Sequence, residues 1–441
     1  MNLLWKTFPK GGLHPRQMKS RLRGKALWNA SIPALSIVPL LQHRGEPADC
    51  LVHPRDTVRE GMLIGRARSD SSCHVHSPVP GIVKYIDEIT LPWGEKTPAV
   101  FIELGGEFNR LGKAVHTYPW EGIPGDRLLT ILSDKGVVGM YSGIPVHRKL
   151  TIPKGKFVRT LIINGIECEP YLCADHRIMV EKAAELVEGA RIAATITCAP
   201  RRVIALTGDR PDALAALREK VREMKADIEV RALWSKYPLG DERQLIKAVT
   251  GEEIPSGGTA LDAGAVVLNA ATTLAMYEAV VLQKPLIERS ITVAGRAIRD
   301  QANLKVRIGT PLADLVEECG GFTRMPEKII VGGPLTGWGL SELSAPVTKT
   351  TAGVLFLSPK EIRNSRRTNC LNCGRCTRSC PMGLQPEAIY KWVEHSAYEE
   401  ARGEGILDCT ECGCCAYACP ARIPLVKEIR AGKMILQSGG V

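Results

Sequence analysis

The sequence predicts an α/β multidomain protein with a small helical, cysteine-rich C-terminal part. Three patterns support this prediction. Short strands broken by Gly and Pro fill residues 30–105, strands alternate with helices from about 116 onward, and one cysteine pattern occurs twice after residue 358. The 441 residues are enough for about three domains, each with its own hydrophobic core.

The first part, residues 1–115, has the pattern of a small β domain. Apolar residues alternate over 48–65, and Ser-Pro-Val-Pro-Gly-Ile-Val follows at 77–83, which indicates hairpins. This order resembles the flattened β-sandwich of lipoyl and biotinyl carrier domains. Those carriers present a modifiable lysine on a hairpin tip, whereas residues 66–76 contain no lysine. We therefore expect a barrel-sandwich scaffold without a swinging cofactor.

The second part, residues 116–287, has the alternation of a Rossmann-like α/β domain. A buried strand is predicted at 159–163 and another at 203–206, with helices at 176–194 and 211–224. This alternation predicts a parallel or mixed sheet covered by helices.

Apolar patterns predict further helices and strands in residues 263–282 and 291–333. The apolar stretch 263–282 carries Asn269 and Glu278, so we expect a buried helix or strand there and not a membrane span. Strand–helix–strand returns over 291–333, with the helix at 312–319 and the last strand at 328–331.

The last part, residues 358–441, repeats one cysteine pattern at a distance of 39 residues (409 − 370), with a helix predicted at 386–401 between the repeats. The runs are Cys370-x2-Cys373-x2-Cys376-x3-Cys380-Pro381 and Cys409-x2-Cys412-x2-Cys415-x3-Cys419-Pro420. In two-cluster ferredoxins the fourth cysteine of such a run binds the other cluster. This rule assigns one [4Fe–4S] cluster to Cys370, Cys373, Cys376 and Cys419, and another to Cys409, Cys412, Cys415 and Cys380. Zinc is the alternative, but structural zinc sites separate their cysteine pairs by a longer loop.

The remaining cysteines and the net charge indicate the cellular compartment and the kind of partner. Seven scattered cysteines remain outside the runs, including Cys414, which breaks the spacing; an odd number of this kind indicates reduced thiols in the cytosol. The first ten residues lack the apolar run of an export signal. Basic residues cluster at 10–25 and 363–367 and contribute to a net charge of +11. Without interleaved aromatics, they favour an acidic redox partner, anionic lipid or a solvated basic face over nucleic acid.

From residue 11 to residue 426, the chain resembles the RnfC family, the C subunits of Rnf electron-transport complexes. The most specific matches are Gly-Gly-Leu-His-Pro at 11–15, Asn-Gly-Ile-Glu-Cys-Glu-Pro-Tyr at 164–171, Pro-Ser-Gly-Gly at 255–258, Pro-Leu-Ile-Glu-Arg at 285–289, Pro-Val-Thr-Lys-Thr-Thr at 346–351 and Asp-Cys-Thr-Glu-Cys-Gly-Cys-Cys-Ala-Tyr at 408–417. The resemblance implies a β-grasp, SLBB-like ligand-binding domain at 288–345. It also implies a central domain similar to the NADH-binding flavoprotein subunit of respiratory complex I.

In this family, electrons from NADH are thought to pass through FMN to two [4Fe–4S] clusters. The resemblance therefore implies an oxidoreductase subunit of an ion-translocating complex. Its partners would be the other Rnf subunits, including an acidic iron–sulfur subunit and integral membrane subunits. Attachment would be peripheral, on the cytoplasmic side of the inner membrane.

The resemblance also implies site residues. Glu167 and Glu169 take the catalytic positions beside flavin and nicotinamide. The cofactor-binding positions are Gly139, Gly143, Asn164, Glu242, Asn269 and Thr272. For Thr272 in particular, a helix cap after a strand is the competing interpretation.

One loop departs from the family pattern. Family members carry Gly-Leu-Gly-Gly-Ala-Ala-Phe-Pro-Thr, whose glycines let the backbone approach the flavin phosphate. Here residues 136–146 form a run that is one residue shorter, with Tyr141 and Ser142 in place of small residues. We therefore expect FMN binding that is weakened but retained.

Two other functions share these features. A soluble flavin and iron–sulfur reductase, like the related cobalamin reductase, would keep the central and cluster domains but work without membrane partners. A cluster-bearing electron wire would keep the clusters after losing the flavin site. Diaphorase activity separates the wire from both reductases, and co-purification with membrane subunits separates the Rnf protein from the soluble enzyme.

Overall fold

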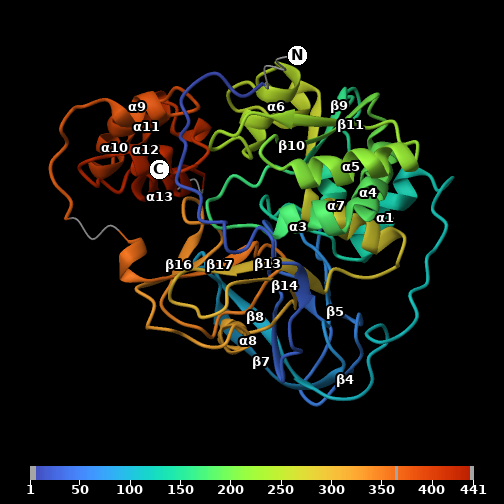
Figure 1. Ribbon diagram of the computed structural model, residues 1–441. Helices are drawn as coiled ribbons and strands as arrows, with labels where there is room; N and C mark the ends of the chain where they lie inside the picture. The colour runs from blue at the N-terminus through green and yellow to red at the C-terminus, as the bar shows by residue number, and fades with distance from the viewer. Residues whose placement is uncertain (1–5, 363–365, 438–441) are drawn as a thin grey trace.

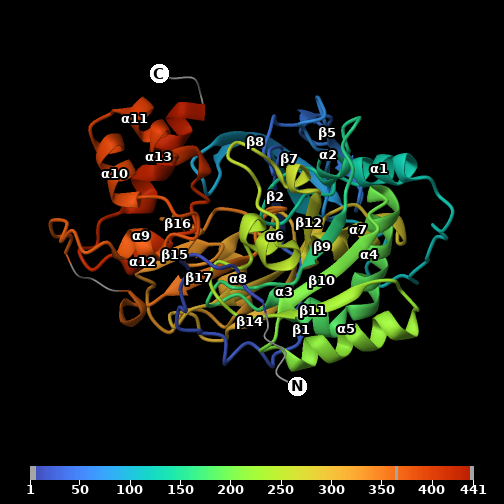
Figure 2. The same cartoon turned by 90° about the horizontal axis from the view of Figure 1, so that it is seen from above.

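The computed structural model describes residues 6–362 and 366–437 (Figure 1). Residues 363–365, which belong to the predicted basic cluster 363–367, lie outside the described residues. The C-terminal helices form a lobe beside the rest of the molecule in both views (Figures 1 and 2). Among the described residues, no helix is long and apolar enough to cross a membrane.

The N-terminal domain is an antiparallel sandwich, as the alternating pattern predicts. One sheet has the order β2-β8-β7-β4 and the other the order β3-β5-β6. Val38, Ile64, Val83 and Ile102 are fully buried between them. The strands are β2 (Leu35–Pro39), β3 (Asp49–Cys50), β4 (Thr57–Val58), β5 (Leu63–Arg66), β6 (Val75–His76), β7 (Gly81–Thr90) and β8 (Lys96–Leu104).

The central domain is a parallel sheet with helices on both faces, which confirms the predicted class of sheet. Its order is β11-β10-β9-β12, formed by β9 (Thr160–Asn164), β10 (Arg201–Thr207), β11 (Glu229–Leu233) and β12 (Ala265–Asn269). Successive side chains of a strand point to opposite faces. Ile163 therefore packs in the core beneath α4 (Ala183–Thr197) and α7 (Ala270–Val280), whereas Ile162 packs toward α6 (Glu242–Thr250). The remaining helices are α1 (Gly125–Asp134), α2 (Val146–Leu150), α3 (Ala174–Glu181) and α5 (Pro211–Glu223).

Two long helices predicted from the sequence are each interrupted. The helix expected at 176–194 is α3 followed by α4, with a break at Lys182. The break allows α3 to contact β13 while α4 packs on α7. The helix expected at 386–401 is α10 (Pro386–Glu394) followed by α11 (Tyr398–Gly403). Ser396, between them, has the left-handed φ of 58° that ends a helix.

The β-grasp domain is built on a six-stranded mixed sheet of the order β1-β14-β13-β17-β15-β16. Its strands β13 (Glu288–Ala294), β14 (Ala302–Arg307), β15 (Lys328–Val331) and β16 (Trp338–Leu340) lie within 288–345, and α8 (Leu312–Glu318) packs against them. Two strands come from outside that range, β1 (Leu27–Asn29) at the edge and β17 (Gly353–Leu357) inside the sheet. The β-grasp unit is therefore completed by residues that precede and follow the predicted segment.

The C-terminal lobe contains α9 (Arg375–Ser379), α10, α11, α12 (Cys414–Ala418) and α13 (Leu425–Gln437). The N-terminal segment runs between this lobe and the central domain (Figure 1). Phe8 is fully buried in the central core, and the Gly12 amide donates to the Ser379 carbonyl (3.0 Å). A Cβ on Gly11 would lie 2.3 Å from the Cys380 carbonyl oxygen, so only glycine allows this approach to a cluster cysteine.

Candidate redox site

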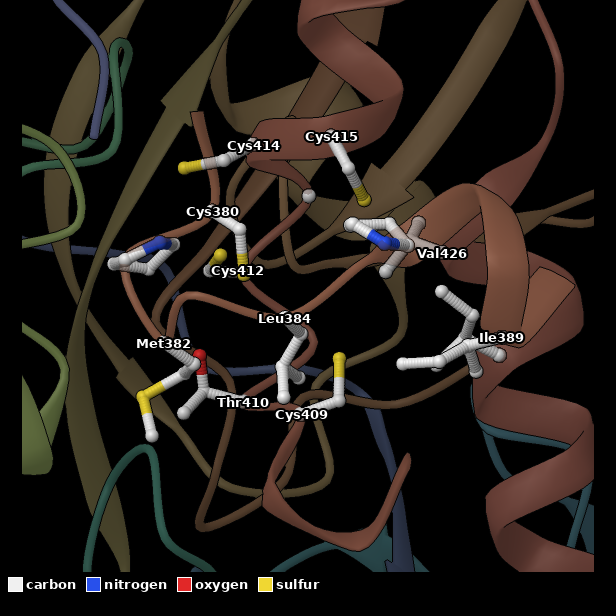
Figure 3. A pocket seen from close by; sticks show the side chains of 14 residues that line it. Cys380, Met382, Leu384, Ile389, Cys409, Thr410, Cys412, Cys414, Cys415 and Val426 are labelled. Atoms are coloured by element: carbon white, nitrogen blue, oxygen red, sulfur yellow. The ribbon is translucent and has the colours of Figure 1, made fainter. Parts of the chain in front are cut away.

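One set of predicted ligands lines a single hollow. It consists of Cys380, Cys409, Cys412 and Cys415, and we call it the buried set. The sulfurs of Cys409 and Cys415 enter the hollow from opposite sides, whereas that of Cys414 points away (Figure 3). The rest of the lining is mainly apolar: Pro381, Met382, Leu384, Pro386, Ile389, Val426 and Ile429. Four cysteines that line one apolar hollow are the kind of ligand set that an iron–sulfur cubane uses, although within the described residues the side chains do not yet converge as a ready-made metal site. Burial raises the pKa of the Cys409 thiol to about 12, so bound iron would stabilise its thiolate.

The other set, Cys370, Cys373, Cys376 and Cys419, lies at the surface, and we call it the exposed set. Cys370 and Cys373 are exposed, and Leu371 between them is 64% exposed. Cys376 and Cys419 pack against the hydrophobic core of the lobe. Basic side chains lie around this set, and Arg378 donates to the Cys373 carbonyl (2.8 Å).

The flavin-side residues gather at the carboxyl ends of the central strands. Asn164 ends β9 and is the register partner of Asn269, which ends β12. Ligands of open α/β sheets bind at this edge. Asn164 donates to the Gly240 carbonyl (2.9 Å), and Asn269 caps α7 by accepting from the Ala271 amide (2.9 Å). Asn269 is therefore a helix cap, whereas Asn164 holds the loop after β9 in place through Gly240 and the Ile166 amide.

Glu167 lies beside these residues, and Asp175 joins it. The Glu167 Oε1 atom accepts from the Asp175 amide (2.9 Å), and Asn269 Nδ2 donates to Asp175 Oδ2 (2.7 Å). Glu167 Oε2 is buried without a hydrogen-bond partner, and the nearest cation, Lys19 Nζ, is 3.9 Å away. Burial, and then the nearby Glu167 charge, raises the pKa of Asp175 to about 7. Glu167 Oε2 therefore has an ion-pair partner in Lys19 but no hydrogen bond.

Glu169 turns instead toward the β-grasp segment between β15 and β16. It accepts from the Thr336 hydroxyl (2.8 Å) and the Leu335 amide (3.2 Å). The Tyr237 hydroxyl lies 3.4 Å from Glu169 Oε1 and donates to the Cys412 carbonyl at 2.7 Å. A single tyrosine therefore connects the loop that carries Glu167 and Glu169 to the buried set.

Glu242 lies apart from the other carboxylates. It begins α6 and pairs with Lys149 of α2 at 2.6 Å. The structure therefore aligns Asn164 with Asn269 and connects Asn269 to Glu167 through Asp175. Glu169 bonds the β-grasp segment instead, and Glu242 pairs with Lys149.

In the glycine loop, residues 136–146, three backbone amides already donate hydrogen bonds within the protein. The Gly143 amide donates to the Gly139 carbonyl, the Gly139 amide to the Ile144 carbonyl (both 2.9 Å), and the Met140 amide to Thr272 Oγ1 (3.0 Å). Thr272 therefore anchors the loop to α7. These three amides are already hydrogen-bonded, so in this conformation they are not available to a phosphate. The strand-end residues, together with Glu167 Oε2, which has no hydrogen bond, fit the ring end of FMN.

Tyr141 reaches from the glycine loop to the carboxyl pair. Its side chain is 49% exposed, and its partly buried hydroxyl lies 3.4 Å from Asp175 Oδ2. This burial, together with the nearby carboxylates, raises the pKa of Tyr141 well above its usual value.

Sequence reasoning did not single out Asp175 or Tyr237. Asp175 lies in the first turn of α3, where an acidic residue is an ordinary helix-terminus feature. Tyr237 lies in a loop before α6, far along the sequence from Glu169 and Cys412. The one available signal for Asp175 was its short distance from the Glu167–Tyr171 motif.

Family models cover the chain in the predicted order. Residues 6–107 match the RnfC barrel sandwich hybrid domain, 132–278 the Nuo51 FMN-binding domain, 290–338 the SLBB domain and 362–420 a 4Fe-4S dicluster domain. These matches confirm the predicted fold class, and they favour iron–sulfur over zinc at the cysteine runs.

Curated relatives match over nearly the whole chain. The C subunit of the proton-translocating ferredoxin:NAD(+) oxidoreductase complex of Clostridium ljungdahlii is 38% identical, over 96% of this chain and 92% of its own. The C subunit of the Na(+)-translocating complex of Acetobacterium woodii is 36% identical, over 98% of both chains. The C subunit of the ion-translocating oxidoreductase complex of Rhodobacter capsulatus is 36% identical, over 96% of this chain and 82% of its own.

A solved structure shares the fold. An NAD+-reducing [NiFe]-hydrogenase in the H2-reduced state aligns with a TM-score of 0.53 at 16% identity, over 72% of this chain and 62% of that one. From the sequence relatives and the family models together, the chain belongs to the RnfC family, the C subunits of the ion-translocating oxidoreductase complexes.

Proposed function

We propose that this chain is the peripheral electron-input subunit of a membrane-bound Rnf complex, an ion-translocating ferredoxin:NAD(+) oxidoreductase. The observation that carries the proposal is the Tyr237 hydroxyl, which lies 2.7 Å from the Cys412 carbonyl and 3.4 Å from Glu169. This contact supports the proposal because one side chain joins a cysteine of the buried set to the loop that carries Glu167 and Glu169. Two redox sites in contact suit electron transfer within one chain.

The cysteines are proposed as ligands of two [4Fe–4S] clusters, the buried set for one and the exposed set for the other. The apolar lining around the buried set excludes water from its cluster. The exposed set, with Cys370 and Cys373 at the surface, is placed to exchange electrons with a partner subunit. Arginines near it suit an acidic iron–sulfur partner.

FMN, when bound, splits the two-electron hydride of NADH into single electrons. Asn164 and Asn269 are proposed to position its ring at the strand ends. Glu167 offers its Oε2, which has no hydrogen bond, to the ring or the nicotinamide, and Asp175 can hold a proton beside it. Glu169 is proposed to fix the loop against the β-grasp segment between β15 and β16.

The glycine loop and Glu242 complete the proposed flavin site. Gly139 and Gly143 shape the loop, and Thr272 holds it to α7 through the Met140 amide. Glu242, at the start of α6, is proposed to reach the cofactor from the opposite side to Glu167.

The proposal also places the chain on the cytoplasmic side of the inner membrane, held by its partner subunits. It should sediment with membranes when the integral subunits are present and remain in the supernatant without them. High salt should weaken attachment if the basic face contributes. Membrane binding by the isolated chain in high salt would contradict this part.

The deciding experiment is an FMN titration of anaerobically purified protein, followed by flavin fluorescence. We expect weak binding by the wild type and tighter binding by Tyr141→Gly, since the ring that spans the loop and the carboxyl pair is removed. Tyr118→Gly, an equally exposed tyrosine in a distant linker, serves as the matched control. Glu167→Gln should slow flavin reduction by NADH more than it loosens FMN. If neither the wild type nor Tyr141→Gly binds FMN, the chain is an electron wire instead.

A further inference from the structure

A second hollow opens beside Tyr171, which follows shortly after Glu167 and Glu169 in the chain. Three parts of the chain line it: the N-terminal segment 16–21, Tyr171 of the central domain, and the turn after β13 with Arg296. No site residue predicted from the sequence lines it.

The charge of this hollow is strongly positive. Arg16, Arg21 and Arg296 line it, and within 6–362 and 366–437 none of them forms an ion pair. Glu361 is the one acid among the lining residues, and its oxygens are already used. Its Oε1 accepts from the Tyr171 hydroxyl (3.0 Å), and its Oε2 from the Arg296 amide (2.9 Å). Three guanidiniums therefore face one hydrogen-bonded carboxylate.

The backbone that presents these arginines is fixed. Between Arg16 and Arg21, the Met18 amide donates to the Pro170 carbonyl (2.9 Å), and the buried Lys19 ammonium donates to the Glu167 carbonyl. Arg296 follows Gly295, where a Cβ would lie 2.0 Å from the Phe356 carbonyl oxygen. The arginines thus project from anchored positions and not from a free chain end.

We propose that this hollow binds a phosphate-bearing small molecule. Guanidiniums bind phosphate oxygens through paired N–H donors, and uncompensated arginines at a concave site are the usual means of recognising them. The enclosed Tyr171 ring and Gln301 provide a floor and further polar contacts. The site does not depend on FMN or on the clusters, so it goes beyond the proposed electron-transfer function.

The test is calorimetric titration of the full, cluster-loaded chain with inorganic pyrophosphate and with ADP. We expect saturable binding that weakens about tenfold on losing one charge-assisted pair, in Arg296→Gln and in Arg16→Gln alike. Arg324→Gln, an exposed arginine of the same domain outside the hollow, is the matched control and should bind like the wild type. Iron content, equal in all variants, confirms that each one folds.

Three results would overturn the proposal. The first is no saturable binding of either probe, and the second is an equal loss in Arg324→Gln. The third concerns the source of the phosphate. If vesicles containing phosphatidic acid bind in an Arg16- and Arg296-dependent way while pyrophosphate and ADP do not, the hollow recognises a lipid headgroup and not a soluble ligand.

Discussion

The buried and the exposed cysteine sets share one local backbone but have different surroundings. In each run the residue two after the first cysteine is left-handed, with φ of 50° at Asn372 and 55° at Glu411. The amide of that residue points at the first sulfur at 3.4 Å in both runs. Three residues after the last cysteine the backbone is left-handed again, at Gly383 and Arg422. The repeat in sequence is therefore a repeat in conformation.

The difference comes from what packs on each loop. The buried set touches the N-terminal segment at Gly11 and the central domain at Tyr237, whereas the exposed set faces outward with Leu371 at its surface. Solvent exposure and hydrogen bonding are among the factors that set the potential of an iron–sulfur cluster. One cysteine pattern thus provides two different redox environments, and the following predictions test that asymmetry.

The largest expected effect is the loss of one cluster. Wild-type protein should carry about eight irons, and Cys415→Ala or Cys370→Ala about four. Cys415→Ala should also lower the free energy of unfolding more, because its cluster fills a hollow in the core of the lobe. Iron analysis and anaerobic denaturation measure both effects. Cys414→Ala is the control, and a loss of iron there would contradict the ligand assignment.

The second-largest expected effect is a difference in how fast oxidants in solution reach the two clusters. Ferricyanide or oxygen should destroy the exposed cluster several times faster than the buried one, because Cys370 and Cys373 lie at the surface. Electron paramagnetic resonance of Cys415→Ala and Cys370→Ala identifies which signal belongs to which set. Equal rates of loss for both signals would contradict the proposed difference in solvent exposure between the two clusters.

Local sequence signals predicted much of this architecture, but contacts between distant segments did not follow from them. The cysteine spacing indicates two equivalent loops because turn geometry is local. Burial of only one loop depends on Gly11 and Tyr237, which lie well over 100 residues from Cys412 (412 − 237 = 175). The strands of the central sheet followed from their apolar runs. β1 and β17 joined the β-grasp sheet from outside its predicted range, since strand pairing is not encoded by local periodicity.

The same limit applies to the flavin edge. Asn164, Glu167 and Asn269 were predicted because each lies where a strand ends or just beyond it. Asp175 was not predicted, since its position between Glu167 and Asn269 depends on how α3 packs over the sheet. The helix breaks at Lys182 and near Ser396 likewise depend on packing partners and not on a strong breaker in the sequence.

A change of pH should alter the folding stability through Asp175 at the flavin edge. The pKa of Asp175 is raised from 3.8 to about 7, mainly by burial and by Glu167, with Arg289 opposing. As pH rises from about 4 to 7 the unfolded chain loses this proton first, so folding stability falls and then levels off. Asp175→Asn should lack this fall. At pH 8 it should exceed the wild type by on the order of 1–3 kcal/mol, with little difference at pH 4.

Denaturation of both proteins at pH 4, 6 and 8 measures this difference directly. Asp126→Asn, an acidic residue in the first turn of α1, is the control and should parallel the wild type. A constant difference between Asp175→Asn and the wild type at all three pH values would mean that Asp175 titrates normally in the folded protein.

The smallest and most specific effect concerns Tyr237, which connects the two redox sites. Tyr237→Phe removes the hydroxyl 2.7 Å from the Cys412 carbonyl while keeping the ring, which is 3% exposed, in the core. We expect a loss of about 1 kcal/mol in stability. We also expect the potential of the buried cluster alone to shift, on the order of tens of millivolts.

Tyr390→Phe is the matched control, because it removes a hydroxyl that bonds Glu394 and Arg367 within the same lobe. Redox titration followed by paramagnetic resonance separates the two clusters. A shift of both potentials in Tyr237→Phe, or an equal shift in Tyr390→Phe, would mean that the hydroxyl only stabilises the lobe and does not tune the buried site.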